Sequence, residues 1–97
     1  MVEIFSYEKD GFSRVRFFYP GNAGHSVALA GIFNDWDSER DKMNYSAADN
    51  GYVCELLLAS GVYEYKLVVD GQWLLDEGNK DFVSNDFGTL NSIITVG

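Results

Sequence analysis

Hydrophobic residues recur along the chain in short alternating runs that are separated by turn-forming residues. No stretch has the 3.6-residue spacing of an amphipathic helix, whereas alternation over about four to eight residues is typical of β-strands. The runs cover residues 2–7, 12–19, 26–33, 52–58, 62–69, 72–76 and 90–96. Turn signals such as Asp49-Asn50-Gly51, Ser60-Gly61 and Asp70-Gly71 stand between them. The pattern predicts an all-β fold, an antiparallel β-sandwich of about seven to eight strands.

The hairpin "YEYKLVVDGQW" shows how the alternation divides side chains between two faces. An Asp70-Gly71 loop with positive φ at both positions pairs Val68 with Trp73 and Lys66 with Leu75. The face predicted to join the core then contains Tyr65, Leu67, Val69 and Leu74. Lys66 and Trp73 are diagonal neighbours on the other face, within roughly 7 Å at Cβ. They could contact one ligand there, although the spacing alone slightly favours ordinary packing against a second sheet or a partner protein.

The polar segments 34–50 and 77–89 are predicted as loops, and loops often carry function. Trp36 lies in "NDWDSERDK", which offers few apolar neighbours to bury an indole. If "FGTLN" is extended, Phe87, Thr89 and Asn91 share one side and provide an apolar wall, a hydroxyl and a carboxamide. Indole rings stack on the C–H groups of sugars, and polar side chains bind sugar hydroxyls. Equally, Gly88-Thr89 fits a simple turn, with Asn91 capping the start of a strand.

Three segments, "VALAGIFNDW", "YEYKLVVDGQW" and "FGTLNSIITV", together resemble the family-48 carbohydrate-binding modules. That family includes the glycogen-binding module of AMP-activated protein kinase β subunits and the N-terminal early-set domains of glycogen branching and debranching enzymes. The resemblance runs from about Val15 to Val96. It implies an immunoglobulin-like (early-set) β-sandwich that binds α-1,4-linked glucan and performs no catalysis.

The resemblance also implies which residues bind the glucan. The family's site combines two tryptophans, a lysine, a bulky apolar residue, a threonine and an asparagine, which fall here on Trp36, Trp73, Lys66, Phe87, Thr89 and Asn91. Phe87 stands where leucine is common and could either enlarge or narrow the stacking surface. Glu77 follows Asp76 where the family often has proline, so the loop could take a different path. Many enzyme-linked members have lost one or both tryptophans, and this chain keeps both.

Alternation bounded by turns also predicts the core of a single domain that covers residues 1–97. The 46% hydrophobic content is sufficient for one core. The predicted core positions include Val15, Phe17, Val27, Leu29, Leu56, Tyr65, Leu67, Val69, Ile94 and Val96.

Charge and cysteine content narrow the possible partners. Fifteen acidic and seven basic residues give a net charge of −8, which repels phosphate backbones and anionic lipid but not a neutral polysaccharide. We therefore expect no nucleic-acid or membrane partner. Cys54 is the only cysteine, which rules out an intrachain disulfide, and its place in an alternating stretch favours a small buried hydrophobe. With no signal-peptide pattern at the start, the chain is expected to be cytoplasmic.

Catalytic and metal sites find little support in the sequence. Acidic residues alternate from Asp35 to Asp41, but a helix–loop–helix calcium site would need glycine and glutamate where Arg40 and Ser46 stand. His25 is the only histidine and belongs to no nucleophile–base set. We expect no catalytic residue, metal or cofactor. The alternative to glucan binding is a structural or regulatory sandwich that docks a partner protein, such as a kinase-type subunit, or a glycoside hydrolase family 13 catalytic domain. Open Trp36 and Trp73 rings on one contiguous surface would support glucan binding, and buried rings would support docking.

Overall fold

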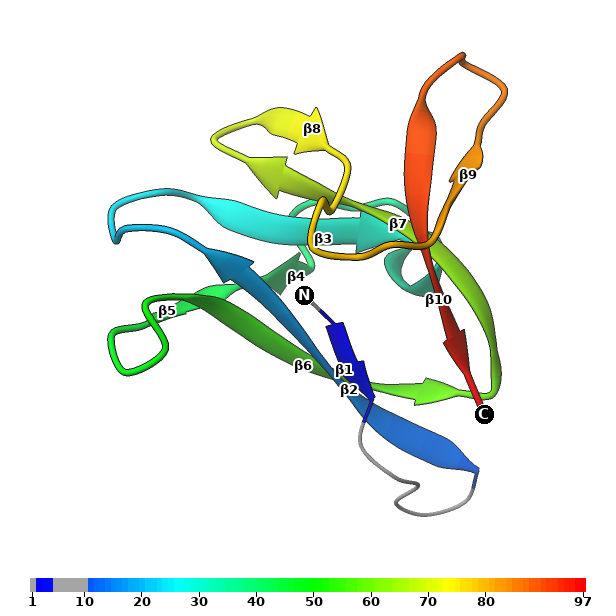
Figure 1. Cartoon of the computed structure of the whole chain (residues 1–97), viewed down its shortest axis with the longest axis horizontal. Helices are drawn as coiled ribbons and strands as arrows, with labels where there is room; N and C mark the ends of the chain where they lie inside the picture. The colour runs from blue at the N-terminus through cyan, green and yellow to red at the C-terminus, as the bar shows by residue number, and fades with distance from the viewer. Residues whose placement is uncertain (1, 5–10) are drawn as a thin grey trace.

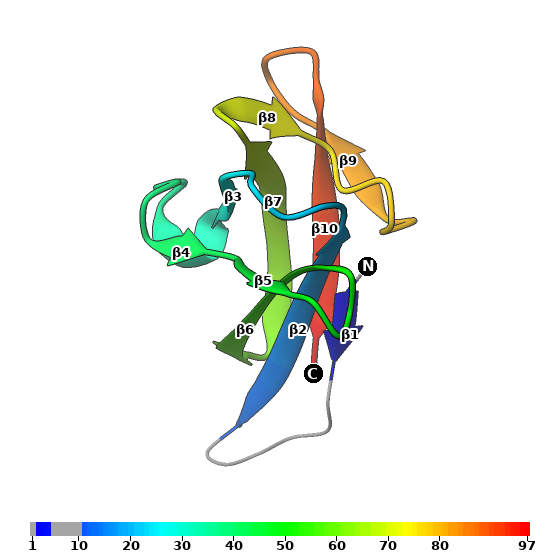
Figure 2. The same ribbon diagram turned by 90° about the vertical axis from the view of Figure 1, so that its left-hand side faces the viewer.

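The computed structural model describes residues 2–4 and 11–97 and folds them into two antiparallel β-sheets (Figure 1). In the first sheet the strand order is β1 (Val2–Ile4), β2 (Phe12–Pro20), β6 (Gly51–Ala59) and β5 (Asn44–Ser46). In the second sheet the order is β4 (Asp41–Lys42), β3 (Val27–Gly31), β7 (Gly61–Val69), β10 (Leu90–Val96) and β9 (Phe82–Ser84). β8 (Gln72–Leu74) pairs with β7 beyond this order, and one 3₁₀ turn, η1 (Ile32–Asn34), follows β3. Figure 2 shows β8 and the turn between β9 and β10 at the same end of the molecule.

The all-β sandwich predicted from the alternation is confirmed, but the number of strands is not. The described residues form ten strands, because β4 and β5 lie in the segment 34–50 and β9 lies in the segment 77–89, both predicted as loops. Each of these strands has only two or three residues, too few to show alternation, and each forms through hydrogen bonds to a longer neighbour. The run at 26–33 ends as a strand at Gly31, and residues 5–7 of the first run lie outside the described residues.

The core between the sheets contains the predicted positions. Buried side chains of the cluster include Val15, Phe17, Val27, Leu29, Tyr65, Leu67, Ile94 and Val96. Leu56 and Val69 are only half-buried but pack against it, so the core prediction is confirmed in outline. Met43 belongs to the same cluster although it lies between two very short strands. Its N–H donates to the carbonyl of Val27 at 2.8 Å, which holds this part of the chain beside β3.

A buried polar network links the β8–β9 connection to this core. The Tyr65 hydroxyl donates to Asp76 Oδ2 at 2.7 Å and accepts from Asn79 Nδ2 at 3.1 Å. Asp76 is itself buried, and its backbone N–H donates to Ser92 Oγ at 2.9 Å. Burial, and then the neighbouring Asp76 carboxylate, raise the pKa of Tyr65 well above its usual value. These bonds fix the path of the chain after Asp76 although Glu77, not proline, comes next.

Cys54 is half-buried in β6. Burial raises the pKa of its thiol to about 11, and the carboxylates of Asp41 and Glu55 add to that shift. The thiol therefore stays protonated near neutral pH, which agrees with the predicted small hydrophobe and disfavours a reactive cysteine. Within residues 2–4 and 11–97, the fold offers no helix of the length and apolarity that crossing a membrane requires.

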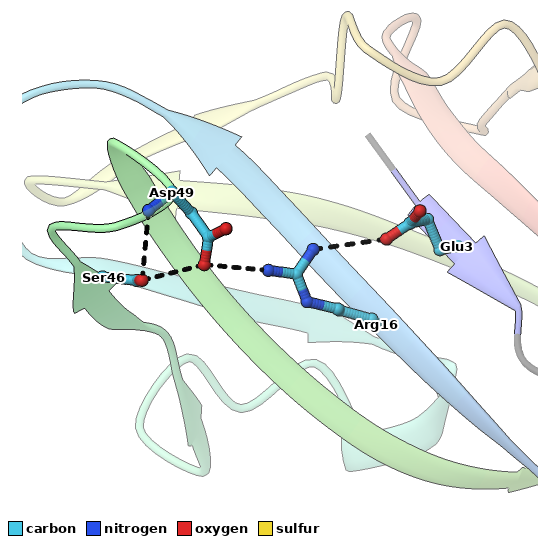
Figure 3. A network of polar contacts seen from close by, with 4 residues as sticks. All are labelled: Glu3, Arg16, Ser46 and Asp49. Carbon is cyan, nitrogen blue, oxygen red and sulfur yellow. Dashed lines mark hydrogen bonds and ion pairs between the residues drawn. The ribbon is translucent and has the colours of Figure 1, made fainter.

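The outer face of the first sheet carries an ion-pair network centred on Arg16 (Figure 3). Arg16 donates from Nη1 to Glu3 Oε1 at 3.3 Å and from Nη2 to Asp49 Oδ2 at 3.2 Å. Ser46 Oγ also donates to Asp49 Oδ2, at 2.8 Å. The network links β1, β2 and the β5–β6 turn.

We expect Arg16→Met to lower the free energy of unfolding by less than ~1 kcal/mol. Both carboxylate partners are about half exposed, and ion pairs in water gain little over hydration. Methionine also keeps much of the packing of the arginine stem. Urea unfolding followed by circular dichroism measures the difference, with Lys42→Met, which removes the exposed pair to Glu39, as a control. A loss above ~2 kcal/mol would contradict a solvent-screened network.

Candidate functional site

The six residues predicted to bind a ligand line one hollow on the second sheet, on the face opposite the core. The hollow has a volume of about 440 Å³ and is lined by Trp36, Lys66, Trp73, Asn85, Asp86, Phe87, Thr89 and Asn91. We call it the Trp73 hollow. It gathers side chains from the η1–β4 connection, β7, β8, the β9–β10 turn and β10. Asn85 and Asp86 were not singled out from the sequence.

The β7–β8 hairpin places Lys66 and Trp73 as its alternation predicts. Leu67 pairs with Leu74 and Val68 pairs with Trp73, and the turn has positive φ at Asp70 (50°) and Gly71 (84°). The predicted pairing of Lys66 with Leu75 is wrong. β8 ends at Leu74, and two residues later Asp76 is hydrogen-bonded to Ser92 of β10 and to the Tyr65 hydroxyl instead of continuing the ladder with β7.

The Asp70 carboxylate anchors this hairpin to the β2–β3 loop. It accepts from the Ser26 backbone N–H at 2.9 Å and lies 2.7 Å from His25 Nδ1. The hydrogen bond from Ser26, and then that from His25, hold the pKa of Asp70 below its usual range. Trp73, which follows the turn in β8, is 45% exposed.

Trp36 is held by a tight turn at the end of η1. Asp35 and Trp36 both have left-handed backbone conformations, with φ of 56° and 59°, and the Trp36 N–H donates to the Gly31 carbonyl at 2.9 Å. The buried Asn34 side chain supports the turn by accepting from the Gly31 N–H at 3.0 Å and donating to Asp41 Oδ2 at 2.9 Å. Left-handed backbone in non-glycine residues is uncommon and persists where the surrounding structure enforces it.

The expectation that Trp36 lacks apolar neighbours is wrong. Its ring is half-buried against Ala28, Ala30 and Val68, which form a small apolar cluster on the outer face of the second sheet. The polar residues beside Trp36 in the sequence could not reveal these contacts, because the neighbours come from strands β3 and β7. The two alanines leave room for the indole to lie on the sheet.

The segment 85–89 turns between β9 and β10, so Phe87, Thr89 and Asn91 do not lie along one extended chain. Gly88 has a φ of 81°, and its N–H donates to the Asn85 carbonyl at 3.2 Å, so the expected turn at Gly88-Thr89 is present. Asn91 lies inside β10, paired with Val83, and does not cap its start. All three residues still line the Trp73 hollow, and Lys66 Nζ of β7 reaches Thr89 Oγ1 across it.

A chain of hydrogen bonds connects the polar residues of the hollow. Lys66 Nζ donates to Thr89 Oγ1 at 3.0 Å, and Asn85 Nδ2 donates to the same oxygen at 2.7 Å. Asn85 Nδ2 also donates to Asn91 Oδ1 at 3.1 Å, and Asn91 Nδ2 donates to Glu64 Oε1 at 3.0 Å. The residue pair Asn85-Asp86, shortly before Gly88, is a turn signal in the sequence that could have indicated the importance of Asn85.

The chemistry of the Trp73 hollow suits a neutral, polyhydroxylated ligand. Aromatic rings supply flat apolar surfaces, and the ammonium, hydroxyl and carboxamide groups supply hydrogen bonds. Among its lining residues, Asp86 is the one carboxylate, whereas most glycoside hydrolases use two. Within the part of the chain that the structure describes, no three His, Cys, Asp or Glu side chains are grouped to hold a metal ion.

A β-sandwich that gathers aromatic rings and hydrogen-bonding groups in one open hollow has the architecture expected of a carbohydrate-binding module. Residues 13–97 match the family described as the glycogen recognition site of AMP-activated protein kinase, and the chain belongs to that family. It is a glycogen-recognition module.

Similar proteins include subunits of that kinase. The chain is 38% identical over 73 residues to the β-1 subunit of AMP-activated protein kinase from Sus scrofa. The aligned residues make up 75% of this chain and 56% of that protein. The Homo sapiens β-1 subunit is also 38% identical over 73 residues, or 25% of its length, and the Mus musculus β-2 subunit is 36% identical over 26% of its length. The chain therefore spans about half of one of these relatives and about a quarter of the others.

Proposed function

We propose that this module binds α-1,4-linked glucan in the Trp73 hollow by ring stacking and hydrogen bonding, without cleaving it. The observation that carries the proposal is that Trp36 and Trp73, from separate elements, line one hollow with Lys66, Thr89 and Asn91. Glycogen recognition by the family points to the same class of ligand.

Each side chain has a distinct role in this proposal. The exposed Trp73 ring stacks on one glucosyl unit, and Trp36, fixed against the sheet, contacts another. Phe87, which is 90% exposed, extends the apolar rim. Lys66, Thr89 and Asn91 bind sugar hydroxyls and fix the orientation of the ring.

The ligand is best matched by a bent chain. Because the two tryptophans belong to different elements, they would contact different glucosyl units, and an α-1,4 glucan curves enough to reach both. A flat β-1,4 chain is a straight ribbon and would meet one ring at a time. β-Cyclodextrin holds the curvature of the α-1,4 chain in advance, which lowers the ordering cost of binding.

Docking of a partner protein on the Trp73 face is the less favoured function. Trp73 is 45% exposed, Trp36 is half-buried but lines the same hollow, and the family is one of glycogen recognition. We propose instead that the module recruits a larger assembly to glucan. The relatives named above are kinase subunits, so a kinase-type complex in the cytoplasm is the assembly we favour.

Titration with β-cyclodextrin while tryptophan fluorescence is followed tests the proposal. We expect saturable binding with a Kd on the order of 10 µM to 1 mM, at least as tight as for linear maltoheptaose. Cello-oligosaccharides should bind far more weakly. Binding should change little with salt, because the ligand carries no charge. Absence of a saturable change at millimolar ligand would favour the docking function.

A further inference from the structure

The carboxamide of Asn85 lies at the centre of the polar contacts in the Trp73 hollow. Its Oδ1 accepts from the backbone N–H groups of Phe87 at 2.9 Å and Thr89 at 3.1 Å. Its Nδ2 donates to Thr89 Oγ1 at 2.7 Å and to Asn91 Oδ1 at 3.1 Å. Both N–H bonds and both oxygen lone pairs are therefore used within the protein. Asn85 has no polar capacity left for a ligand and can act only through its neighbours.

We propose that Asn85 is a positioning residue of the site, which presents Thr89 to the glucan as a hydrogen-bond donor. The inference rests on the proposed glucan binding. Asn85 is not among the six residues that the family resemblance implies. Its role is inferred from its hydrogen bonds alone.

The oxygen of the carboxamide holds the turn. It accepts from two backbone N–H groups, and the Asn85 N–H also donates to the Thr89 carbonyl at 2.9 Å. Phe87 extends from this turn with 90% of its surface exposed, so little packing fixes its ring. The direction in which Phe87 faces the hollow is therefore set by the turn that Asn85 closes.

The nitrogen of the carboxamide sets the polarity of Thr89. Thr89 Oγ1 accepts from Asn85 Nδ2 and from Lys66 Nζ, which occupies both of its lone pairs. The hydroxyl hydrogen is then the only hydrogen-bonding capacity that Thr89 has left. Thr89 can therefore donate to a ligand but cannot accept from it.

The two ends of the hydrogen-bond chain fix its direction. Lys66 can only donate, and the Glu64 carboxylate accepts from Asn91 Nδ2. The carboxamides of Asn91 and Asn85 must then point their oxygens away from Glu64, as observed. The hollow presents the Thr89 hydroxyl and the remaining N–H bonds of Lys66 as donors. The ligand groups that fit them are oxygens with free lone pairs, which glucan provides on its ring, its linkages and its hydroxyls.

The variant Asn85→Asp tests this role because it has nearly the same shape. One carboxylate oxygen can still accept from the Phe87 and Thr89 N–H groups, so the turn should survive. The other replaces the donor to Thr89 and Asn91, and the Thr89 hydroxyl should rotate to donate to it. Because the Thr89 hydrogen is then unavailable to the ligand, we expect about a tenfold rise in the Kd for β-cyclodextrin at neutral pH.

A double-mutant cycle with Thr89→Val separates positioning from a general structural effect. If Asn85 acts through Thr89, the combined variant should lose little more affinity than the worse single variant. A combined loss equal to the product of the single losses, or wild-type affinity in Asn85→Asp, would overturn the inference. Asn44→Asp, on β5 of the other sheet, adds the same charge and should bind normally.

A second substitution covers the case in which Asn85→Asp does not fold, as judged by circular dichroism. Asn85→Ser keeps an oxygen that can close a turn but removes the donor that holds Thr89 Oγ1. Thr89 is then less well positioned but keeps its hydroxyl hydrogen, so a smaller loss than in Asn85→Asp is expected, with the same non-additivity in the cycle. Wild-type affinity in Asn85→Ser would likewise overturn the inference. If the unmodified protein itself fails to bind β-cyclodextrin, both the proposed function and the role of Asn85 are rejected. Binding by the unmodified protein together with additive losses would reject the role of Asn85 alone.

Discussion

Replacing Trp73 by alanine is expected to weaken glucan binding by ~1.5–3 kcal/mol, which corresponds to roughly 10- to 150-fold in Kd. A stacked indole contributes apolar burial and a fixed geometry, and an alanine side chain supplies neither. Isothermal titration with maltoheptaose measures the loss. Because Trp73 is 45% exposed on a three-residue strand, the variant should remain folded, which circular dichroism can verify.

Lys66→Ala is the matched comparison. A lysine near solvent exchanges water hydrogen bonds for sugar hydrogen bonds at a net gain of ~1 kcal/mol, so its loss should be about fivefold. A larger loss for Lys66→Ala than for Trp73→Ala would show that stacking does not dominate. Trp36→Ala is a less suitable comparison, because Trp36 also packs on Ala28, Ala30 and Val68 and its removal would affect stability.

Tyr65→Phe should lower the free energy of unfolding by about 2–3 kcal/mol. The change removes the hydroxyl that donates to Asp76 Oδ2 at 2.7 Å and leaves a buried carboxylate short of a donor. Tyr63→Phe is the control, because the Tyr63 hydroxyl donates at the surface to the Ala59 carbonyl, where water can replace it. Its expected cost is below ~1 kcal/mol. Urea unfolding at pH 7.5 measures both, and equal losses would contradict the special role of the buried network.

The same variant should change how stability depends on alkaline pH. Burial and the Asp76 carboxylate raise the pKa of Tyr65, so above about pH 10 the unfolded chain releases a proton that the folded chain retains. The stabilisation from Tyr65 is complete below that pH and falls above it, by up to ~1.4 kcal/mol per pH unit. Cys54, with a pKa of about 11, contributes in the same direction in both proteins. Urea unfolding between pH 8 and 11 should therefore show a steeper decline for the unmodified protein than for Tyr65→Phe, and parallel curves would contradict the assignment.

The β7–β8 hairpin was predictable because local rules decide it. The Asp70-Gly71 turn and the alternation on either side fix which residues pair and which face each side chain occupies. The prediction failed only at Leu75, because β8 has already ended at Leu74 and the residue after Leu75, Asp76, is hydrogen-bonded to Ser92 in β10. The core positions followed from the same alternation.

The short strands and the environment of Trp36 could not be predicted in this way. β4, β5 and β9 exist because longer strands offer them hydrogen bonds, and a run of two or three residues has no pattern of its own. The apolar residues that contact Trp36 come from β3 and β7, so its polar neighbours in the sequence could not indicate how far its ring is buried.

The sequence by itself determined the sandwich, the core, the hairpin and, through a family resemblance, the six residues proposed to bind glucan. These depend on alternation, turn chemistry and motif spacing, which are local properties of the chain. Only the tertiary structure decided that those residues line one hollow, that a turn at Gly88 brings Phe87 and Thr89 to it, and that Asn85 connects them. Hydrogen bonds between Asn85, Thr89, Lys66 and Asn91 join a turn to two strands, and such contacts exist only once those elements have come together.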